Sequence, residues 1–281
     1  MATDATLPTC ARHPDRETRL VCPRCGRPAC DLCLTFADDV RMCQVCREES
    51  RLDASTPVRP VRRPAQAAAP VTMALLVTFV AVFALGSLTG DFASEIGNNG
   101  AQINELVLAG QWWRVLTGTL LHSDIAHLLL NGYALYILGA QLERGVGSGP
   151  FAALYVASAL AGGIAFLLAA PDQVAVGASG AIFGLFGAWL AAAWVNRDTP
   201  QGRAGVSQLG LLLLINLALP LFIPSIAWQA HLGGLLAGAL IGLGWARLGR
   251  RDVDVAPAAR VVLPVTIAGA LLAALLWYTW A

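Results

Sequence analysis

A serine and a histidine stand in long apolar stretches of this chain, where polar side chains are rare. Ser179 lies in the small-residue turn Gly177-Ala-Ser-Gly180, and His231 opens a later apolar run. Serine becomes a nucleophile at neutral pH when a base takes its proton, and histidine has a suitable pKa for that role. Ser179 is also predicted to begin a helix, where free backbone N–H groups favour a developing anion. These residue types predict nucleophilic chemistry by a Ser–His pair.

A second group of polar residues precedes this pair. His122, Ser123, His127 and Asn131 occur in the run His-Ser-Asp-Ile-Ala-His-Leu-Leu-Leu-Asn. We expect Ser123 to cap a helix that begins near Asp124. His127 and Asn131 are then four residues apart on one helix face, and both can donate hydrogen bonds.

The composition indicates which elements must position these groups. Hydrophobic residues make up 56% of the 281 residues and charged residues only 13%, with a mean hydropathy of +0.61. Soluble domains average roughly 25% charged residues, so the composition predicts an all-α polytopic membrane protein. Seven apolar segments are predicted to span the bilayer: 71–90, 115–140, 150–170, 179–195, 207–223, 228–246 and 261–280.

The fourth span, 179–195, is the shortest of the seven. Its helix would be roughly 26 Å long against a hydrocarbon core of about 30 Å, so one end should lie recessed among other helices. Gly184 and Gly187 follow the serine in this span, and Gly234 and Gly238 follow the histidine in the sixth span. Small residues let helix backbones approach, so we expect the fourth and sixth spans to be neighbours.

Arginine placement predicts the orientation, because cytoplasmic loops carry an excess of positive charge. Arg59, Arg62 and Arg63 precede the first span, whereas the outward loops carry only Arg114. We therefore expect a cytoplasmic N-terminus, an outer C-terminus and a location in the bacterial inner membrane. The second, fourth and sixth spans then run from outside to inside, so every candidate group lies in the outer leaflet.

These motifs resemble those of the rhomboid intramembrane serine proteases. Gly-x-Ser-Gly occurs on one span, His-x4-His-x3-Asn on an earlier one and Ala-His-x2-Gly-x3-Gly on a later one, in the family's order. The resemblance covers residues 71–247 and implies a six-helix rhomboid core, with a seventh span as in the six-plus-one variant of the family. Trp113 and Arg114 look like the family's Trp-Arg pair in the first loop.

The resemblance implies a role for each motif residue. Ser179 would be the nucleophile and His231 the general base, a dyad without an acidic third member. His127, Asn131 and the backbone N–H of Ser179 would form an oxyanion hole. The implied reaction is cleavage of transmembrane protein substrates within the lipid bilayer near its outer face, at small residues followed by helix-weakening ones. The protease itself would need no metal.

His122, Gly177 and Phe183 would support this site. The family often has a tyrosine four residues after the serine, stacked beneath the base, and here the residue is Phe183. Stacking can persist, whereas a hydrogen bond from a tyrosine hydroxyl is absent. How finely His231 is adjusted as a base without this hydroxyl stays open.

Two alternatives come from other classes of protein. A non-catalytic rhomboid-like protein would bind membrane clients without cutting them, but such relatives typically lack the dyad residues. A transporter or channel would also use polar groups and glycine-rich helices, and it would usually carry a membrane-embedded carboxylate or an internal repeat. Cleavage of a transmembrane reporter discriminates between these classes.

Metal-ligating residues are concentrated in the first 50 residues. Seven cysteines and one histidine form four pairs with two residues between the partners: Cys10/His13, Cys22/Cys25, Cys30/Cys33 and Cys43/Cys46. This spacing suits zinc, and the odd number of cysteines argues against a complete set of disulfides within the chain. So few large apolar side chains occur here that the segment needs such cross-links to fold.

The four pairs resemble those of B-box-type zinc domains, which bind two structural zinc ions in a cross-braced arrangement. The resemblance implies that the first pair shares an ion with the third, and the second with the fourth. Sequential pairing is the alternative.

The chain is therefore expected to have four parts: a zinc module at 1–50, a linker rich in proline, alanine and arginine at 51–70, the core at 71–247, and a loop with the seventh span at 248–281. The zinc module is expected to dock a cytoplasmic protein or to regulate the core. Nucleic acid is not an expected partner, because nine acidic residues accompany the eleven arginines that precede the first span.

Overall fold

The computed structural model describes residues 7–37, 40–52, 68–89, 97–249 and 257–280. The chain divides into two compact units, residues 1–65 and 66–281. The division falls within the predicted linker, most of which lies outside the described residues. The N-terminal unit contains the predicted metal ligands, and the larger unit contains the predicted spans.

The N-terminal unit is built around sulfur rather than aliphatic side chains. Strands β1 (Leu34–Ala37) and β2 (Val40–Cys43) pair antiparallel, and helix α1 (Gln44–Leu52) follows directly. Among the described residues of this unit, the buried core consists of five cysteines with Ala29 and Leu34. The small sheet departs from the predicted all-α class, because these short segments hold β-branched and aromatic residues that favour strands.

The larger unit is helical. Its main helices are α2 (Pro70–Thr89), α6 (Ile125–Ala134), α7 (Ala140–Val146), α8 (Ser148–Ala169), α9 (Ser179–Val195), α10 (Pro200–Ala218), α11 (Trp228–Gly249) and α12 (Pro257–Trp280). A π-helical segment, Leu135–Gly139, joins α6 and α7. By length and composition, five of the described helices can cross a membrane, and α9 is a shorter apolar helix. This architecture is that of a polytopic membrane protein.

The second span begins later than predicted, at Ile125 rather than at residue 115. The helix cap is Asp124, whose carboxylate accepts the backbone N–H three residues on, and not Ser123 as predicted. A carboxylate is favoured there because it faces the positive end of the helix dipole. The residues before it form the short helix α5 (Arg114–Thr117) and the 3-10 turn Gly118–Leu120.

Glu143 is a buried carboxylate within the second span, which extends to Val146. Its two oxygens accept the backbone N–H groups of Val71 and Thr72 and the hydroxyls of Thr72 and Ser148, at 2.6–2.9 Å. The carboxylate therefore caps the free N–H groups at the start of α2. A carboxylate with its oxygens engaged in this way serves the fold rather than an ion path.

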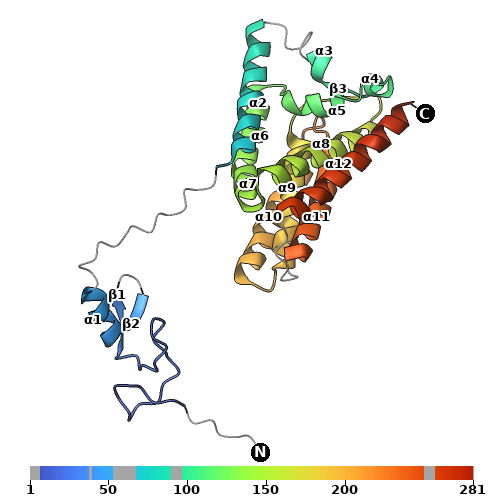
Figure 1. Cartoon of the computed structure of the whole chain (residues 1–281). Coiled ribbons are helices and arrows are strands. Elements are labelled where there is room, and N and C mark those ends of the chain that lie inside the picture. Colours follow the sequence, from blue (N-terminus) through green and yellow to red (C-terminus); the bar gives the residue numbers. More distant parts are fainter. Residues whose placement is uncertain (1–6, 38–39, 53–67, 90–96, 250–256, 281) are drawn as a thin grey trace, which may run out of the picture. The chain divides into compact units, whose positions relative to one another are not determined.

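Helix α9 is central in the larger unit and packs against α8 and α11 (Figure 1). Glycines on both sides bring α9 and α11 together: a Cβ on Gly238 would overlap the carbonyl oxygen of Gly184, and one on Gly187 would overlap that of Leu235. The two backbones are thus in direct contact, which side chains would prevent. The predicted proximity of the fourth and sixth spans is confirmed.

A layer of short elements connects α2 to α6. It contains α3 (Gly97–Gly100), β3 (Gln102–Ile103) and α4 (Asn104–Leu108), followed by α5. Strand β3 pairs antiparallel with β4 (Val174–Ala175), which belongs to the connection from α8 to α9. The pairing ties this layer to the loop that leads into α9.

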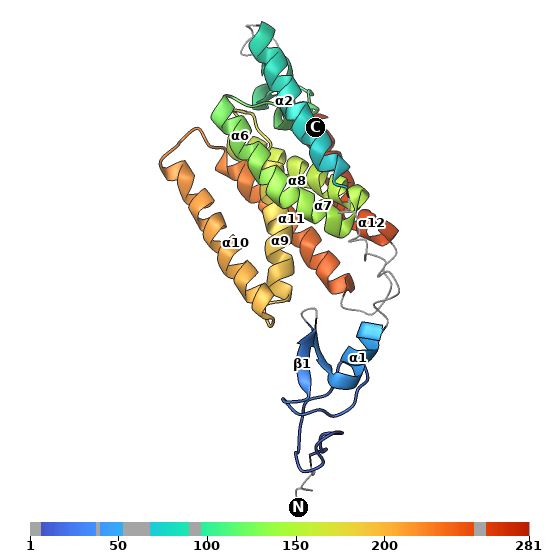
Figure 2. The ribbon, with the colours of Figure 1, turned by 90° about the vertical axis from the view of Figure 1, so that its left-hand side faces the viewer.

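Helices α10 and α12 lie outside the central packing. Figure 2 shows α10 beside α9 at the edge of the unit. Helix α10 begins at Pro200 rather than at residue 207, because Thr199 caps it by accepting the N–H of Gly202 and proline suits the first helical position. Helix α12 packs along α8, and its Leu275 is buried in a cluster with residues of α4 and α8.

Gly238→Ala should destabilise the larger unit, whereas Gly210→Ala should not. Both changes replace a helical glycine by alanine, but the Cβ at 238 would overlap backbone of α9 and the Cβ at 210 meets nothing within 4 Å. Overpacking of this kind costs about 1–3 kcal/mol. Thermal unfolding in detergent should show a lower Tm for Gly238→Ala alone. Equal Tm values would contradict the backbone contact between α9 and α11.

Candidate active site

Ser179 and His231 meet where α9 and α11 begin. The Nε2 atom of His231 lies 2.8 Å from the Oγ atom of Ser179, a hydrogen-bond distance. Ser179 is the first residue of α9, and His231 lies in the first turn of α11. The close approach of the two helices therefore places a potential base against a potential nucleophile.

Phe183 holds the ring of His231 from one face. The two ring centroids are 4.1 Å apart, and the ring planes differ by 8°. Because Phe183 lies one turn after Ser179 on α9, the stacking orients the imidazole relative to the serine. The Nδ1 atom of His231 has no hydrogen-bond partner among the described residues. Within that part of the chain, the arrangement is a pair without an acidic third member.

Gly177 shapes the turn before Ser179. Its φ of +117° is a conformation that residues with a side chain rarely adopt. Its N–H donates to the carbonyl oxygen of Gly118 at 2.9 Å. A Cβ at this position would lie 2.5 Å from Nε2 of His127 and 3.7 Å from Nδ2 of Asn131. The turn thus brings two side chains of α6 next to the start of α9.

The predicted residues of α6 and of the segment before it pack together. Asn131 donates from Nδ2 to the backbone carbonyl oxygen of His127 at 3.1 Å, so the two lie on one helix face. His122 is fully buried, and its ring centroid lies 5.0 Å from that of Phe79 and 5.1 Å from that of His127. Neither ring nitrogen of His122 has a partner among the described residues. His122 therefore contacts His127 by ring packing.

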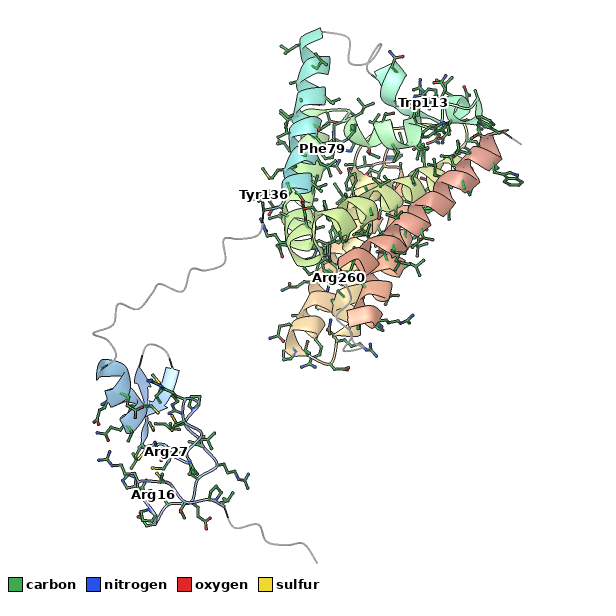
Figure 3. All side chains as sticks on the ribbon, in the orientation of Figure 1. Arg16, Arg27, Phe79, Trp113, Tyr136 and Arg260 are labelled. Atoms are coloured by element: carbon green, nitrogen blue, oxygen red, sulfur yellow. The ribbon has the colours of Figure 1, made fainter. Side chains whose placement is uncertain are left out.

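The Trp113–Arg114 pair divides between two environments. The guanidinium of Arg114 is buried, donating from Nε to Oε1 of Gln111 at 2.7 Å and from Nη1 to the carbonyl oxygen of Ala101 at 2.9 Å. Trp113 is 44% exposed and lies at the end of the unit that holds α4 and α5 (Figure 3). The arginine ties the layer of short elements together, and the tryptophan faces the surroundings.

Two buried amides that the sequence analysis did not single out attach this layer to α8. Gln102 donates from Nε2 to the carbonyl oxygen of Gly163 at 2.8 Å and to Oδ1 of Asn104 at 2.9 Å. Asn104 donates from Nδ2 to the carbonyl oxygen of Ala170 at 2.7 Å. The only sequence signal was two amides close together between spans, which is common in loops and therefore not specific.

A cavity of about 30 Å³ lies beside Ser179. Its lining is mostly small residues, and it includes Gln102, Thr119, Gly163 and Gly177. Such a volume holds about two or three water molecules, each of which needs roughly 10–15 Å³. A side chain no larger than a few atoms would also fit beside the serine.

In the N-terminal unit, the eight predicted ligands form two clusters. One contains Cys10, His13, Cys30 and Cys33, and the other contains Cys22, Cys25, Cys43 and Cys46, with the ligand atoms of each cluster within 4.8 Å of one another. The first pair thus meets the third, and the second meets the fourth. This is the crossed arrangement and not the sequential one.

The cluster geometry fits a tetrahedral metal ion. The Sγ atoms of Cys10 and Cys33 are 3.8 Å apart, as are those of Cys25 and Cys43. Zinc–sulfur bonds of about 2.3 Å in a tetrahedron require roughly that separation, whereas a disulfide requires about 2.05 Å. Backbone hydrogen bonding, chiefly from Cys30, lowers the pKa of the Cys10 thiol to about 5, whereas burial raises the pKa of the Cys33 thiol to about 11, so the two thiols of this cluster differ in how readily they form the thiolate that binds a metal.

Comparison with known proteins relates the larger unit to one family. The Rhomboid domain matches residues 109–248. The putative rhomboid protease YdcA of Bacillus subtilis (strain 168) is 37% identical over 136 residues, which are 48% of this chain and 68% of YdcA. The chain belongs to the rhomboid family.

Further rhomboid relatives match over a smaller share of their own length. Rhomboid protease GluP of Bacillus subtilis (strain 168) is 40% identical over 152 residues, which are 53% of this chain and 30% of GluP. RHOMBOID-like protein 5 of Arabidopsis thaliana is 36% identical over 158 residues, which are 55% of this chain and 51% of that protein. With the apolar helices, the rhomboid domain identifies an integral membrane protein.

Gly177→Ala should slow the reaction of Ser179 in this rhomboid with a fluorophosphonate, whereas Gly110→Ala should not. Both glycines have positive φ, +117° and +94°, so both variants are strained. Only the Cβ at 177 would displace His127, since one at 110 meets nothing within 4 Å. The rhomboid resemblance implies that His127 is an oxyanion donor, and loss of such a donor lowers rates by about 10²–10³, so we expect roughly a hundredfold slower labelling. Equal slowing in both variants would show that backbone strain alone causes the slower labelling.

Proposed function

We propose that this rhomboid is an intramembrane serine endopeptidase with Ser179 as nucleophile and His231 as general base. The observation that carries the proposal is the 2.8 Å contact between Ser179 Oγ and His231 Nε2 at the start of two packed helices. His231 would take the hydroxyl proton as Oγ attacks a peptide carbonyl, and would then return the proton to the leaving amine. The stacked ring of Phe183 would keep the imidazole in place during both transfers.

The charge that develops on the carbonyl oxygen needs donors at the same place. The backbone N–H of Ser179, at the start of α9, is one candidate, because the first N–H groups of a helix have no partner within it. His127 and Asn131 border the same turn at Gly177 and can supply side-chain donors. We assign these three groups to the oxyanion hole, with His122 packed behind His127.

Substrates of this protease would be transmembrane segments of other proteins. A helical segment shields its carbonyl groups through its own hydrogen bonds, so it must unwind locally before Ser179 can attack. The cavity of about 30 Å³ beside Ser179 favours a small side chain, such as alanine, at the cleavage point. The exposed Trp113 lies at the catalytic end of the unit and Arg260 toward the other end (Figure 3), which agrees with cleavage near the outer face.

Ser179→Ala should abolish cleavage of a transmembrane reporter in liposomes. The reporter carries alanine at the cleavage point and helix-weakening residues beyond it. Ser87→Ala is the matched control, because among the described residues this exposed serine of α2 donates only to the carbonyl oxygen of Phe83. We expect wild type and Ser87→Ala to cleave at the same rate and Ser179→Ala to show no product by mass spectrometry.

Three results would contradict the protease proposal. Equal cleavage by Ser179→Ala and wild type would exclude this nucleophile. No cleavage by wild type across varied reporters, together with stable reporter binding, would indicate a non-catalytic rhomboid-like protein. Ion or solute flux through the same liposomes without cleavage would indicate a transporter or channel.

We also propose that the N-terminal unit binds two structural zinc ions through the two crossed clusters. Four ligands fill each tetrahedral site, so no position is open for a substrate, and the zinc would serve as a cross-link. Apart from Ala29 and Leu34, the described core of the unit consists of cysteines, and such cross-links would make up for the small apolar core. We assign it a docking or regulatory role toward a cytoplasmic protein.

Metal analysis of paired serine variants tests the crossed arrangement. Wild type should contain about two zinc ions per chain. The double variant Cys10→Ser/Cys30→Ser should keep about one ion, because both changes fall in one cluster, whereas Cys10→Ser/Cys22→Ser should keep none. Sequential pairing gives the reverse result. Zinc near zero in wild type purified without chelators would overturn the zinc proposal altogether.

A further inference from the structure

Ser123 lies between a carboxylate and a histidine at the start of α6. Its Oγ atom is 2.8 Å from Oδ2 of Asp124 and 3.1 Å from Nδ1 of His127. The other carboxylate oxygen of Asp124, Oδ1, accepts the backbone N–H of His127 at 2.9 Å. The three residues therefore form one closed network around the base of the His127 side chain.

The hydroxyl of Ser123 has one proton, and the acceptor of this proton determines whether Nδ1 of His127 carries a proton. An ionised carboxylate can only accept, so the 2.8 Å contact requires Ser123 to donate its proton to Asp124. The Ser123 oxygen then remains as an acceptor toward Nδ1, and His127 must donate from Nδ1. If Ser123 donated its proton to Nδ1 instead, its Oγ atom and Oδ2 of Asp124 would both be acceptors and would face each other at 2.8 Å with no proton between them.

The opposite edge of the His127 ring lies at the turn that precedes the nucleophile. Its Nε2 atom would be 2.5 Å from a Cβ at Gly177, so it borders this glycine directly. If Nδ1 donates to Ser123, then Nε2 can donate to an oxyanion only when the ring is an imidazolium. The carboxylate of Asp124 lies one hydrogen bond away, through Ser123, from the ring that would carry this charge.

The surroundings of His127 supply no competing partner for Nδ1. The other titratable groups near the ring are His122, which contacts it edge to face, and His231, which is paired with Ser179. Neither is a hydrogen-bond partner of His127 among the described residues. The orientation of the His127 ring thus depends on Ser123.

We propose that Ser123 is a positioning residue for the oxyanion donor His127. It holds the ring through Nδ1, so that the Nε2 edge faces the turn before Ser179 and, in the imidazolium form, can donate to the substrate oxygen. Ser123 acts through His127: among the described residues, its hydroxyl makes hydrogen-bond contacts with Asp124 and His127 and not with the Ser179–His231 pair. The inference rests on the proposed protease function and adds a residue to it.

A double-mutant cycle between Ser123→Ala and His127→Ala tests this role. In the wild-type background, Ser123→Ala should lower kcat by about tenfold with little change in KM, because a donor that acts in the transition state is misplaced. In the His127→Ala background, Ser123→Ala should have no further effect, since no ring remains to be oriented. Ser123→Thr keeps the hydroxyl and should restore most of kcat. Where His127→Ala cleaves too slowly, the rate of fluorophosphonate labelling replaces kcat.

A purely structural role would give a different pattern. If Ser123 served only to stabilise α6, Ser123→Ala would lower the Tm and reduce kcat by the same factor in both backgrounds. That result would overturn the proposal, as would an unchanged kcat in Ser123→Ala. Asp124→Asn provides a second variant: asparagine also caps helices well, so the Tm should change little, whereas kcat should fall because the ionised acceptor of the Ser123 proton is lost. An unchanged kcat in Asp124→Asn would count against the proposal.

Cleavage measured in parallel for Ser123→Ala and Ser179→Ala separates this inference from the protease proposal. If Ser179→Ala is inactive while Ser123→Ala is fully active, the protease function stands and the positioning role fails. If Ser179→Ala still cleaves the reporter, the protease assignment itself fails, whatever the result for Ser123→Ala.

Discussion

Direct backbone contact between α9 and α11 is the constraint on which the site depends. Helices in a bilayer gain little from burying apolar surface against each other, because the lipid is equally apolar, so close van der Waals packing has to hold them. Gly184 contributes twice: its carbonyl oxygen meets α11 at Gly238, and its missing side chain leaves room for Ser158 of α8. With α8 and α11 converging on α9 in this way, the first turns of α9 and α11 lie close enough for a serine hydroxyl to reach an imidazole.

Several other polar side chains of the larger unit satisfy helix ends that apolar surroundings would leave without partners. Glu143 covers the free N–H groups of α2, and Asn104 covers carbonyl oxygens at the end of α8. Each end of a helix exposes several backbone groups without a partner, and a membrane offers no water to satisfy them. Asp124 does the same at the start of α6. The polar groups proposed to do chemistry thus stand beside other polar groups that satisfy helix ends.

The sequence predicts the parts of the site that depend on local spacing. Ser179 among small residues and the glycines after His231 are visible as patterns, and the four ligand pairs of the N-terminal unit are equally regular. The contacts of Gln102 and Glu143 could not be predicted in the same way, because their partners lie 61 and 71–72 residues away and depend on how the helices pack. The start of α6 was misplaced for a related reason, since serine and aspartate are both good caps and only the backbone conformation at Asp124 distinguishes them.

The sulfur-lined core of the N-terminal unit has a thermodynamic consequence. A domain held by metal–thiolate bonds gains its folding free energy from the ion, so its folded population follows the concentration of free metal. Above saturation, each tenfold change in that concentration alters the stability by about 1.4 kcal/mol per bound ion, and two ions double the slope. The N-terminal unit would then respond to cellular zinc supply far more steeply than the larger unit, whose described core is made of helix contacts.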